Sequence, residues 1–453
     1  MTTERTRAIR RISMTNLFGM YDYDLAISED TSKTEKIFIL YGDNGSGKTT
    51  ILKLAFHLLA PEGGKSHKST AALIPFEHFE IELQDNTKVC ADRPKGQLIG
   101  SFSMGIKSPP QKEKRVEFIV NEDNIMRPVS KKHDEQIREF LKALSKLDIS
   151  LYMLSDDRTI HFAGWERRVP APSYDMEFDN EWIYSEAKLP ARIQHRPQID
   201  PEIIAQRLLE QSIRRAEMWI QGKAMRGSSI GESSITTLYN EILRRLASQP
   251  QDESLDSTAT KKSIEKRVKK LESQCKEFAQ YGLLPKFSGK EILAAVSSAP
   301  PSYTSIIMNV LNPYLESLKK KLEAMAEVYR RVDSFVSIIN RFLTNKKLTF
   351  DLHSGMAITT NDGTFLEPAM LSSGERHLFL LFCNSFVAVD RPSILMIDEP
   401  EISLNIKWQR RLLNSLLECS GDSPVQYLFA THSIELLAQH RGQVAKLENI
   451  RGK

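Results

Sequence analysis

A glycine-rich loop at residues 42–49, GDNGSGKT, carries the residue types that bind the phosphates of a nucleotide. Its glycines let the backbone turn tightly, and the amides from about Gly45 onward can point at phosphate oxygens beside a helix N-terminus. Lys48 would place a cation at the β- and γ-phosphates, and the Thr49 hydroxyl would bind Mg²⁺. The predicted nucleotide-binding residues are Asn44, Gly45, Ser46, Gly47, Lys48, Thr49 and Thr50.

Two acidic residues follow an apolar run near the C-terminus. The sequence SILMIDEP at 393–400 indicates a buried strand with Asp398 and Glu399 at its carboxyl end. Ligands gather at that end of strands in open α/β sheets. We expect Asp398 to hold Mg²⁺, directly or through water, and Glu399 to polarise an attacking water for in-line phosphoryl transfer.

A third motif lies just before that strand. Residues 371–375, LSSGE, precede a helical run, and small residues at a helix N-terminus can form an anion site. Ser372 and Ser373 could equally serve only as a helix cap, which is a common feature. The position next to the acidic strand favours the anion-binding interpretation.

Taken together and in this order, these motifs resemble the P-loop, signature and Walker B segments of ABC-type ATPases. The resemblance implies ATP and Mg²⁺ as ligands and ATP hydrolysis as the activity. It also implies a head-to-tail homodimer, in which the signature of one copy binds the γ-phosphate held by the P-loop of the other. The signature residues acting in trans would be Ser372, Ser373, Gly374 and Glu375.

The same resemblance assigns two further segments. Residues 401–405, EISLN, look like the D-loop that crosses the dimer interface, with Ser403 and Asn405 as its candidate residues. Asn405 departs from the Asp or His common there. His432, in the segment YLFATHS, matches the switch histidine that senses the γ-phosphate, so Glu399 and His432 are the expected catalytic pair.

Two candidates carry a weaker signal. Transporter-type domains place a glutamine on a loop downstream of the P-loop, and Gln84 in a hairpin or Gln97 in a loop could fill this role. Residues 155–158, SDDR, resemble the strand-end arginine site of RecF-like and OLD-like ATPases. Arg158 would either reach a phosphate or pair with the adjacent acids.

The pattern of elements that must position these residues is α/β. We expect an N-terminal strand and hairpin, a buried strand KIFILY, and a helix from about Lys48 to Ala60. Antiparallel hairpins follow over 77–129, and the last hundred residues alternate strand and helix, which indicates a parallel sheet. The predicted fold is thus an ABC-type ATPase with a mixed or parallel core sheet and an antiparallel β subdomain.

A long helical, coiled-coil-like insertion interrupts this domain. Asp200-Pro201 is a helix start, and apolar residues then recur at heptad spacing over 264–278 and 311–343. Such helices would pack side by side, and an antiparallel arrangement is one possibility. They would form either a projecting arm or dimerisation domain, or an ordinary helical core. The predicted divisions are 1–165 for the first part of the ATPase domain, 166–345 for the insertion and 346–453 for the second part.

Composition limits the class of protein. The chain has 453 residues, enough for two or three domains, and a net charge of +4, which does not demand nucleic-acid binding. It has four scattered cysteines, no apolar run long enough to span a bilayer and no apolar segment typical of a secretory signal. These features predict a cytoplasmic protein without a disulfide framework or a membrane partner.

The long gap between the P-loop and LSSGE is typical of the SMC, RecF and OLD branch, including AAA15- and AAA21-like ATPases. Within it the chain resembles most the AriA-like ATPase subunit of the PARIS anti-phage defence system, whose partner is a TOPRIM nuclease. The Septu ATPase, paired with an HNH nuclease, is the nearest rival. The sequence ends soon after His432 and shows no HNH pattern, so we expect any nuclease to be a separate protein.

The implied function is that of a slow, regulatory ATPase that acts as sensor and scaffold for an effector nuclease encoded by a neighbouring gene. Its partners would be a second copy or a higher oligomer, the TOPRIM- or HNH-type nuclease, and a phage-derived trigger protein or DNA. The alternative is an SMC- or RecF-like DNA-repair ATPase that clamps DNA. Basic clusters at 266–270 and 319–321 motivate this alternative, although such runs are most often solvated faces.

Overall fold

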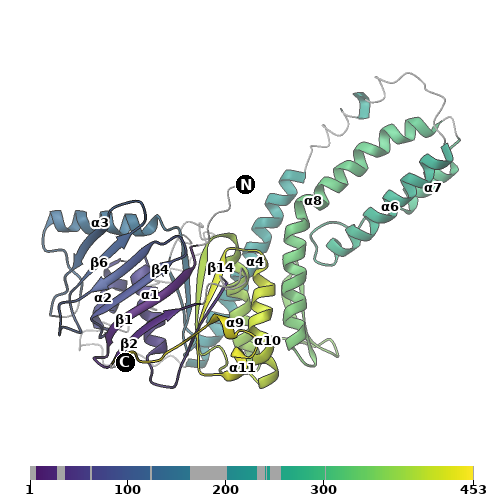
Figure 1. The fold of residues 1–453 in the computed structure, drawn as a ribbon. Helices are drawn as coiled ribbons and strands as arrows, with labels where there is room; N and C mark the ends of the chain where they lie inside the picture. The colour runs from purple at the N-terminus through teal and green to yellow at the C-terminus, as the bar shows by residue number, and fades with distance from the viewer. Residues whose placement is uncertain are drawn as a thin grey trace. The chain divides into compact units, whose positions relative to one another are not determined.

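The computed structural model divides into two units, which we describe separately (Figure 1). The first comprises Met1–Leu209 and Ser372–Lys453, and the second comprises Glu210–Leu371. The structure describes residues 7–27, 36–61, 64–122, 125–163, 201–231, 240, 242–244, 257–300 and 303–451. The predicted division at 165/166 falls within 164–200, a range outside the described residues.

The core sheet of the first unit has the strand order β15-β3-β14-β13-β8-β9. All neighbouring strands run parallel except β8 and β9, which pair antiparallel. Parallel strands covered on both faces need continuous apolar runs, and β8, β13 and β14 are buried along their whole length. The strands are β3 (Ile37–Tyr41), β8 (Ser150–Leu154), β9 (Ile160–Ala163), β13 (Ser393–Asp398), β14 (Val425–Thr431) and β15 (Val444–Lys446).

The antiparallel β subdomain forms a second sheet of order β2-β1-β4-β5-β6-β7. Helix α1 (Lys48–Leu59) contacts β8, β13 and β14 of the core sheet and β5 of this second sheet, so it joins the two. Helices α2 (Gly64–Leu73) and α3 (Lys131–Ser145) complete this side. The strands are β1 (Ile9–Leu17), β2 (Tyr21–Ala26), β4 (His78–Leu83), β5 (Lys88–Asp92), β6 (Phe102–Lys107) and β7 (Lys114–Phe118).

The C-terminal part of the first unit supplies helices α9 (Ser373–Val387), α10 (Ile406–Ser420) and α11 (Ile434–Leu437). Leu380 and Leu381 of α9 line a small space together with core-strand residues that include Leu154 and Leu395. Met153 and Met396 also line this space but, unlike Leu154 and Leu395, they belong to the core cluster that includes residues of α1. The side chains therefore alternate between two covered faces, and the mixed α/β fold is as expected from the sequence.

The second unit consists of helices and a small sheet. Its sheet order is β10-β11-β12, with antiparallel pairing throughout. The helices are α4 (Pro201–Gly231), which starts in the first unit, α6 (Ser257–Ala279), α7 (Lys290–Ser298) and α8 (Thr304–Phe342). The strands are β10 (Lys346–Asp351), β11 (Gly355–Thr360) and β12 (Phe365–Leu366).

Helices α6 and α8 pack in parallel, not antiparallel as one prediction had it. From the middle of α6, the Arg267 guanidinium donates to Asn312 Oδ1 in the first quarter of α8 at 2.8 Å. Further along both helices, the rings of Phe278 and Tyr329 stack with centroids 4.4 Å apart. The segment between the helices, which contains α7, returns the chain to the beginning of α6, where the Lys261 ammonium donates to Ala299 O at 2.7 Å. This return makes the parallel arrangement possible.

The sheet after α8 goes with the helical unit, whereas the sequence-based division at 345/346 placed it with the ATPase domain. The reason is local pairing. The Asn340 side chain, near the end of α8, donates to Leu348 O at 2.9 Å and accepts from Leu348 N at 2.7 Å. This pair of hydrogen bonds attaches β10 directly to the helix.

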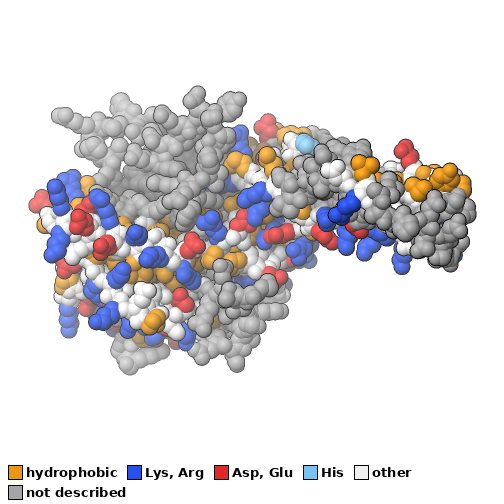
Figure 2. Space-filling view, turned by 90° about the horizontal axis from the view of Figure 1, so that it is seen from above, with side chains coloured by type: hydrophobic (Ala, Val, Ile, Leu, Met, Phe, Trp, Pro, Cys, Tyr) orange, Lys and Arg blue, Asp and Glu red, His pale blue; other side chains and the backbone are white. Residues whose placement is uncertain are grey.

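On the face shown in Figure 2, lysine and arginine side chains are interspersed with acidic ones over the described residues. Among the described residues, Lys269 and Lys319 pair with Glu265 and Glu323, one helical turn away. Within the described part of the chain, no helix combines the length and the apolar character needed to cross a bilayer.

Candidate nucleotide site

Three neighbouring strands bring the predicted catalytic segments to one edge of the core sheet. Tyr41 at the end of β3 pairs with Thr431 at the end of β14, and Asp398 at the end of β13 pairs with Ala430. The P-loop, the histidine loop (residues 431–433) and the acidic pair Asp398–Glu399 thus follow neighbouring strands and lie side by side. This edge, at the carboxyl ends of parallel strands, is where such sheets bind ligands.

The P-loop turns through two glycines with positive φ, Gly45 at 82° and Gly47 at 91°. A side chain at Gly47 would also place its Cβ 2.9 Å from Leu17 of the N-terminal strand, so this position needs glycine twice over. Lys48 is only 5% exposed, and its ammonium donates to the carbonyls of Gly42 and Asp43 at 2.9 and 3.0 Å. The cation is therefore held at the mouth of the loop, where phosphate oxygens could replace the carbonyls.

Asp398 fits the expected Mg²⁺ ligand. The residue is 2% exposed, and neither carboxylate oxygen has a hydrogen-bond partner of normal geometry among the described residues. Burial raises the pKa of Asp398, and the Thr49 side chain, the next largest influence, lowers it. Buried polar groups are rarely left without a partner, so a carboxylate and a nearby hydroxyl in this state suit a hard divalent cation.

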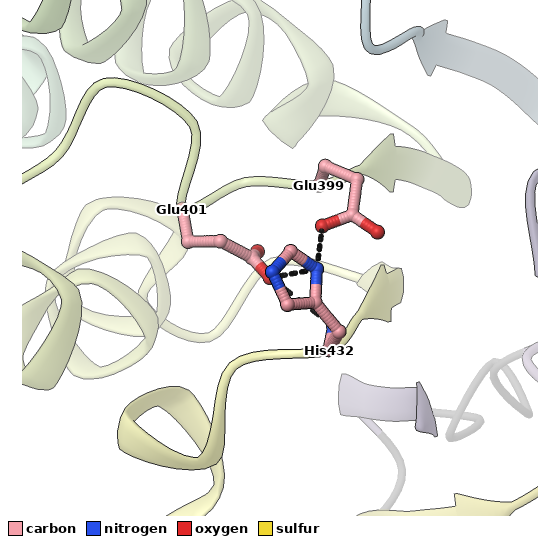
Figure 3. Close-up of side chains that lie close together, drawn as sticks. All are labelled: Glu399, Glu401 and His432. Carbon is pink, nitrogen blue, oxygen red and sulfur yellow. Dashed lines mark hydrogen bonds and ion pairs between the residues drawn. The ribbon is translucent and has the colours of Figure 1, made fainter. Parts of the chain in front are cut away.

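The Glu399 carboxylate lies next to the imidazole of the predicted switch histidine (Figure 3). His432 Nδ1 forms a hydrogen bond with Glu399 Oε2 at 2.5 Å, and the Lys48 ammonium lies 3.7 Å from Glu399 Oε1. Burial and then the neighbouring Glu401 carboxylate raise the pKa of Glu399 to about 7. Its φ of 45° is uncommon for a residue with a side chain, and the Glu399 amide is held by Ala430 O at 2.8 Å.

Glu401 belongs to the same cluster, although the sequence interpretation gave it no role of its own. Its Oε1 lies 3.4 Å from His432 Nδ1 and accepts hydrogen bonds from the histidine loop. The only signal for Glu401 in the sequence was its position, as a second acidic residue two positions after Glu399. Acids that follow a buried strand are common, so the sequence could not show that this one is itself buried.

The LSSGE segment begins helix α9 with a capping box. The Ser372 hydroxyl accepts from the Glu375 amide, and the Glu375 carboxylate accepts from the Ser372 amide at 2.8 Å. The side chains of Ser372 and Glu375 are thus occupied in the cap, while Ser373 is exposed at the helix N-terminus. A Cβ on Gly374 would lie 2.5 Å from Ser403 O, so this glycine permits close approach of the D-loop.

Arg158 and Asn405 both make hydrogen bonds within the chain. The Arg158 guanidinium donates to Ser403 Oγ at 2.7 Å, and this hydrogen bond joins the β8–β9 turn to the D-loop. Both Arg158 and Ser403 have positive φ, at 67° and 64°. Asn405 caps helix α10, because its side chain accepts from Trp408 N at 3.0 Å.

Gln84 lies at the wrong end of its sheet for a nucleotide-sensing glutamine, which corrects that prediction. Its amide donates to Ala8 O, just before β1 begins, whereas Leu17 at the other end of β1 contacts the P-loop. Nine residues of extended strand separate these ends by about 30 Å. Gln97 lies next to Leu98, whose side chain approaches Gly19 near the P-loop end.

Comparison with known proteins identifies the family of the chain. The family model described as AAA ATPase domain matches residues 8–437. The uncharacterized ABC transporter ATP-binding protein YejF of Escherichia coli K12 is 31% identical over 82 residues, which span 18% of this chain and 15% of that protein.

Among solved structures, the chain is similar to two Smc head domains from Pyrococcus species. The Smc head domain with an extended coiled coil, bound to the C-terminal domain of ScpA, from Pyrococcus furiosus has a TM-score of 0.38 at 12% identity, covering 98% of this chain and 96% of that one. The Smc head domain with a coiled coil and joint from Pyrococcus yayanosii has a TM-score of 0.34 at 13% identity, with coverage of 98% and 97%.

Proposed function

Because the chain belongs to the AAA ATPase domain family, we propose that it binds ATP with Mg²⁺ and hydrolyses it at the edge of the core sheet. The observation that carries this proposal is the position of Glu399, which contacts His432 with one carboxylate oxygen and faces Lys48 with the other. A water held by this carboxylate would be polarised next to the group that binds the γ-phosphate.

Each residue of the site has a defined task in this scheme. Lys48 leaves the carbonyls of Gly42 and Asp43 for the phosphate oxygens, and Glu399 orients the attacking water and accepts its proton. His432 holds the Glu399 carboxylate in place. Bound Mg²⁺, held by Thr49 and Asp398, would neutralise charge on the β- and γ-phosphates.

A phosphate-release assay tests this proposal. The purified chain should release phosphate from ATP in the presence of Mg²⁺, and Lys48→Ala should abolish release because it weakens nucleotide binding. Binding of a fluorescent ATP analogue to both proteins separates loss of affinity from loss of chemistry. A wild-type chain that neither binds nor hydrolyses ATP would overturn the proposal.

We further propose that the active form is a head-to-tail dimer, in which the exposed N-terminus of α9 completes the site of the second copy. Exposed Ser373 supports this proposal, because it leaves the first residue of the helix accessible to a second copy. Sedimentation with and without ATP tests it, since dimers should form only with nucleotide.

The finer role that we propose is a slow, regulatory cytoplasmic ATPase of an anti-phage defence complex that controls a separate nuclease. The helical unit inserted between the two parts of the ATPase domain supports this role as a surface for a partner. Co-expression with the neighbouring gene tests it. The two proteins should co-purify and arrest growth only in phage-infected cells, whereas a monomer indifferent to every neighbouring product would overturn it.

A DNA-clamping repair ATPase is the alternative, favoured by exposed lysines such as Lys266 and Lys320 on α6 and α8. The pairs that Lys269 and Lys319 make with glutamates reduce the charge available there. DNA binding should weaken steeply with salt if this alternative is correct. No binding at low salt, together with an ATPase rate that DNA leaves unchanged, would exclude it.

A further inference from the structure

One carboxylate oxygen of Glu401 gathers three donors from the histidine loop. Glu401 Oε1 accepts from the Thr431 hydroxyl at 2.5 Å and from the backbone amides of His432 and Ser433, both at 3.1 Å. All three donors come from consecutive residues at the end of β14. A single side chain of the turn after β13 thus determines the backbone path of the loop that carries the histidine.

This arrangement sets the position of the imidazole. With its own amide bonded to Glu401, His432 directs Nδ1 to Glu399 Oε2, 2.5 Å away. The loop has a further support in Ser433, whose hydroxyl donates to Gln409 Oε1 at 2.9 Å. That contact holds the far side of the loop and does not involve the histidine, so the orientation of His432 depends mainly on Glu401.

A buried carboxylate is a costly way to hold a loop. Glu401 is 7% exposed, and its second oxygen, Oε2, is buried without a hydrogen-bond partner among the described residues. The Glu401 and Glu399 carboxylates also lie close together, and the repulsion between two like charges adds to the cost of burying Glu401 in its ionised form. The three hydrogen bonds to Oε1 offset part of this cost, and they fix the backbone of the loop that places His432 beside Glu399.

We propose that Glu401 is a positioning residue that acts through His432, fixing the histidine against Glu399 so that the carboxylate is oriented for the attacking water. This inference rests on the proposed ATPase activity. Glu401 touches neither nucleotide nor water in this scheme. Its removal should therefore lower turnover and leave nucleotide affinity nearly unchanged.

The test compares Glu401→Ala and Glu401→Gln with Glu435→Gln as a matched control. Glu435 lies two residues beyond the loop and pairs with Arg410 on the surface, so its loss should change nothing. We expect kcat to fall by about 10–100-fold in Glu401→Ala, with the KM for ATP within about twofold of wild type. Glu401→Gln, which keeps an acceptor oxygen, should recover part of the loss.

Hydrogen exchange gives a readout that does not depend on catalysis. The amides of His432 and Ser433 should exchange faster in Glu401→Ala, while those of α10 remain as in wild type. If wild type hydrolyses ATP and both Glu401 variants keep its kcat, the positioning role is wrong and the ATPase proposal stands. The role is also wrong if both variants lose nucleotide affinity instead of turnover. If wild type itself does not hydrolyse ATP, the ATPase proposal fails, and unchanged exchange at the two amides would refute the Glu401 contact independently.

Discussion

Lys68 offers a prediction about stability that follows from the packing around the P-loop helix. This lysine of α2 is fully buried, with 0% exposure, and its ammonium donates to the carbonyls of His57, Leu58 and Ala60 at 2.7, 2.8 and 3.2 Å. These acceptors lie at the C-terminal end of α1, the helix that begins with Lys48. Replacing Lys68 with methionine keeps the volume and removes the three hydrogen bonds.

The expected cost can be worked out from these contacts. A buried acceptor left unpaired costs about 1–3 kcal/mol of stability. Three unpaired carbonyls would therefore lower the free energy of unfolding by about 3–9 kcal/mol before any compensation. Removing a buried charge offsets part of it, because the desolvation of the ammonium is no longer needed. We expect Lys68→Met to lower the free energy of unfolding by about 3 kcal/mol, which is about 5 °C in Tm for a unit as large as Met1–Leu209 with Ser372–Lys453.

The pH dependence of this difference has a definite sign. Burial lowers the pKa of Lys68 to about 7 from its ordinary value of 10.5, so the unfolded chain binds the proton more tightly between these values. The free energy of unfolding of the wild type therefore rises with pH above about 7, and the variant lacks this contribution. His57 stays neutral in this range, because burial holds its pKa well below its ordinary value.

Urea unfolding of wild type and Lys68→Met at about pH 7 and about pH 9 measures both effects. The stability difference should be present at the lower pH and larger at the higher one. Lys88→Met is the control, since Lys88 makes a partly exposed pair with Glu80 and its loss should cost less than about 1 kcal/mol. Equal stability of wild type and Lys68→Met, or a difference that shrinks as pH rises, would refute the reasoning.

Two further predictions concern the nucleotide site. Glu399→Gln should retain ATP binding and lower kcat by about 100-fold or more, because the amide cannot accept the proton of the attacking water. Parallel binding and phosphate-release measurements check this, and turnover at the wild-type rate would show that another group acts as the base. Asp398→Asn should raise the Mg²⁺ concentration for half-maximal activity by about 10–100-fold. A Mg²⁺ titration of ATP hydrolysis measures this shift, and an unchanged half-maximal concentration would remove Asp398 from the metal site.

Local sequence patterns were sufficient to predict those parts of the site that a single continuous segment of the chain forms. The buried strand KIFILY, the glycines after it and the helix from Lys48 form one continuous unit, so composition and order predict it. The same holds for the apolar strand that ends in Asp398. In both cases the parallel sheet needs continuous apolar residues, which is a signal that a single segment carries.

Contacts between distant segments could not be predicted in this way. Arg158 binds Ser403 because the β8–β9 turn lies beside the D-loop, which only the strand order determines. Gln84 was misplaced because a hairpin pattern does not say which of its ends faces the P-loop. The parallel direction of α6 and α8 depends in turn on the path of the segment between them, which the heptad spacing does not specify.

The central claim is a composite ATP site, and mixing two inactive variants tests it most directly. Lys48→Ala keeps the signature and loses the P-loop lysine, whereas Ser373→Arg keeps the P-loop and blocks the signature. Each alone should be inactive. In an equal mixture, half of the dimers combine the two variants, and each of these has one intact site of two, so about one quarter of the wild-type rate of phosphate release should return. A mixture no more active than the separate variants, or a fully active Ser373→Arg protein, would contradict the composite site.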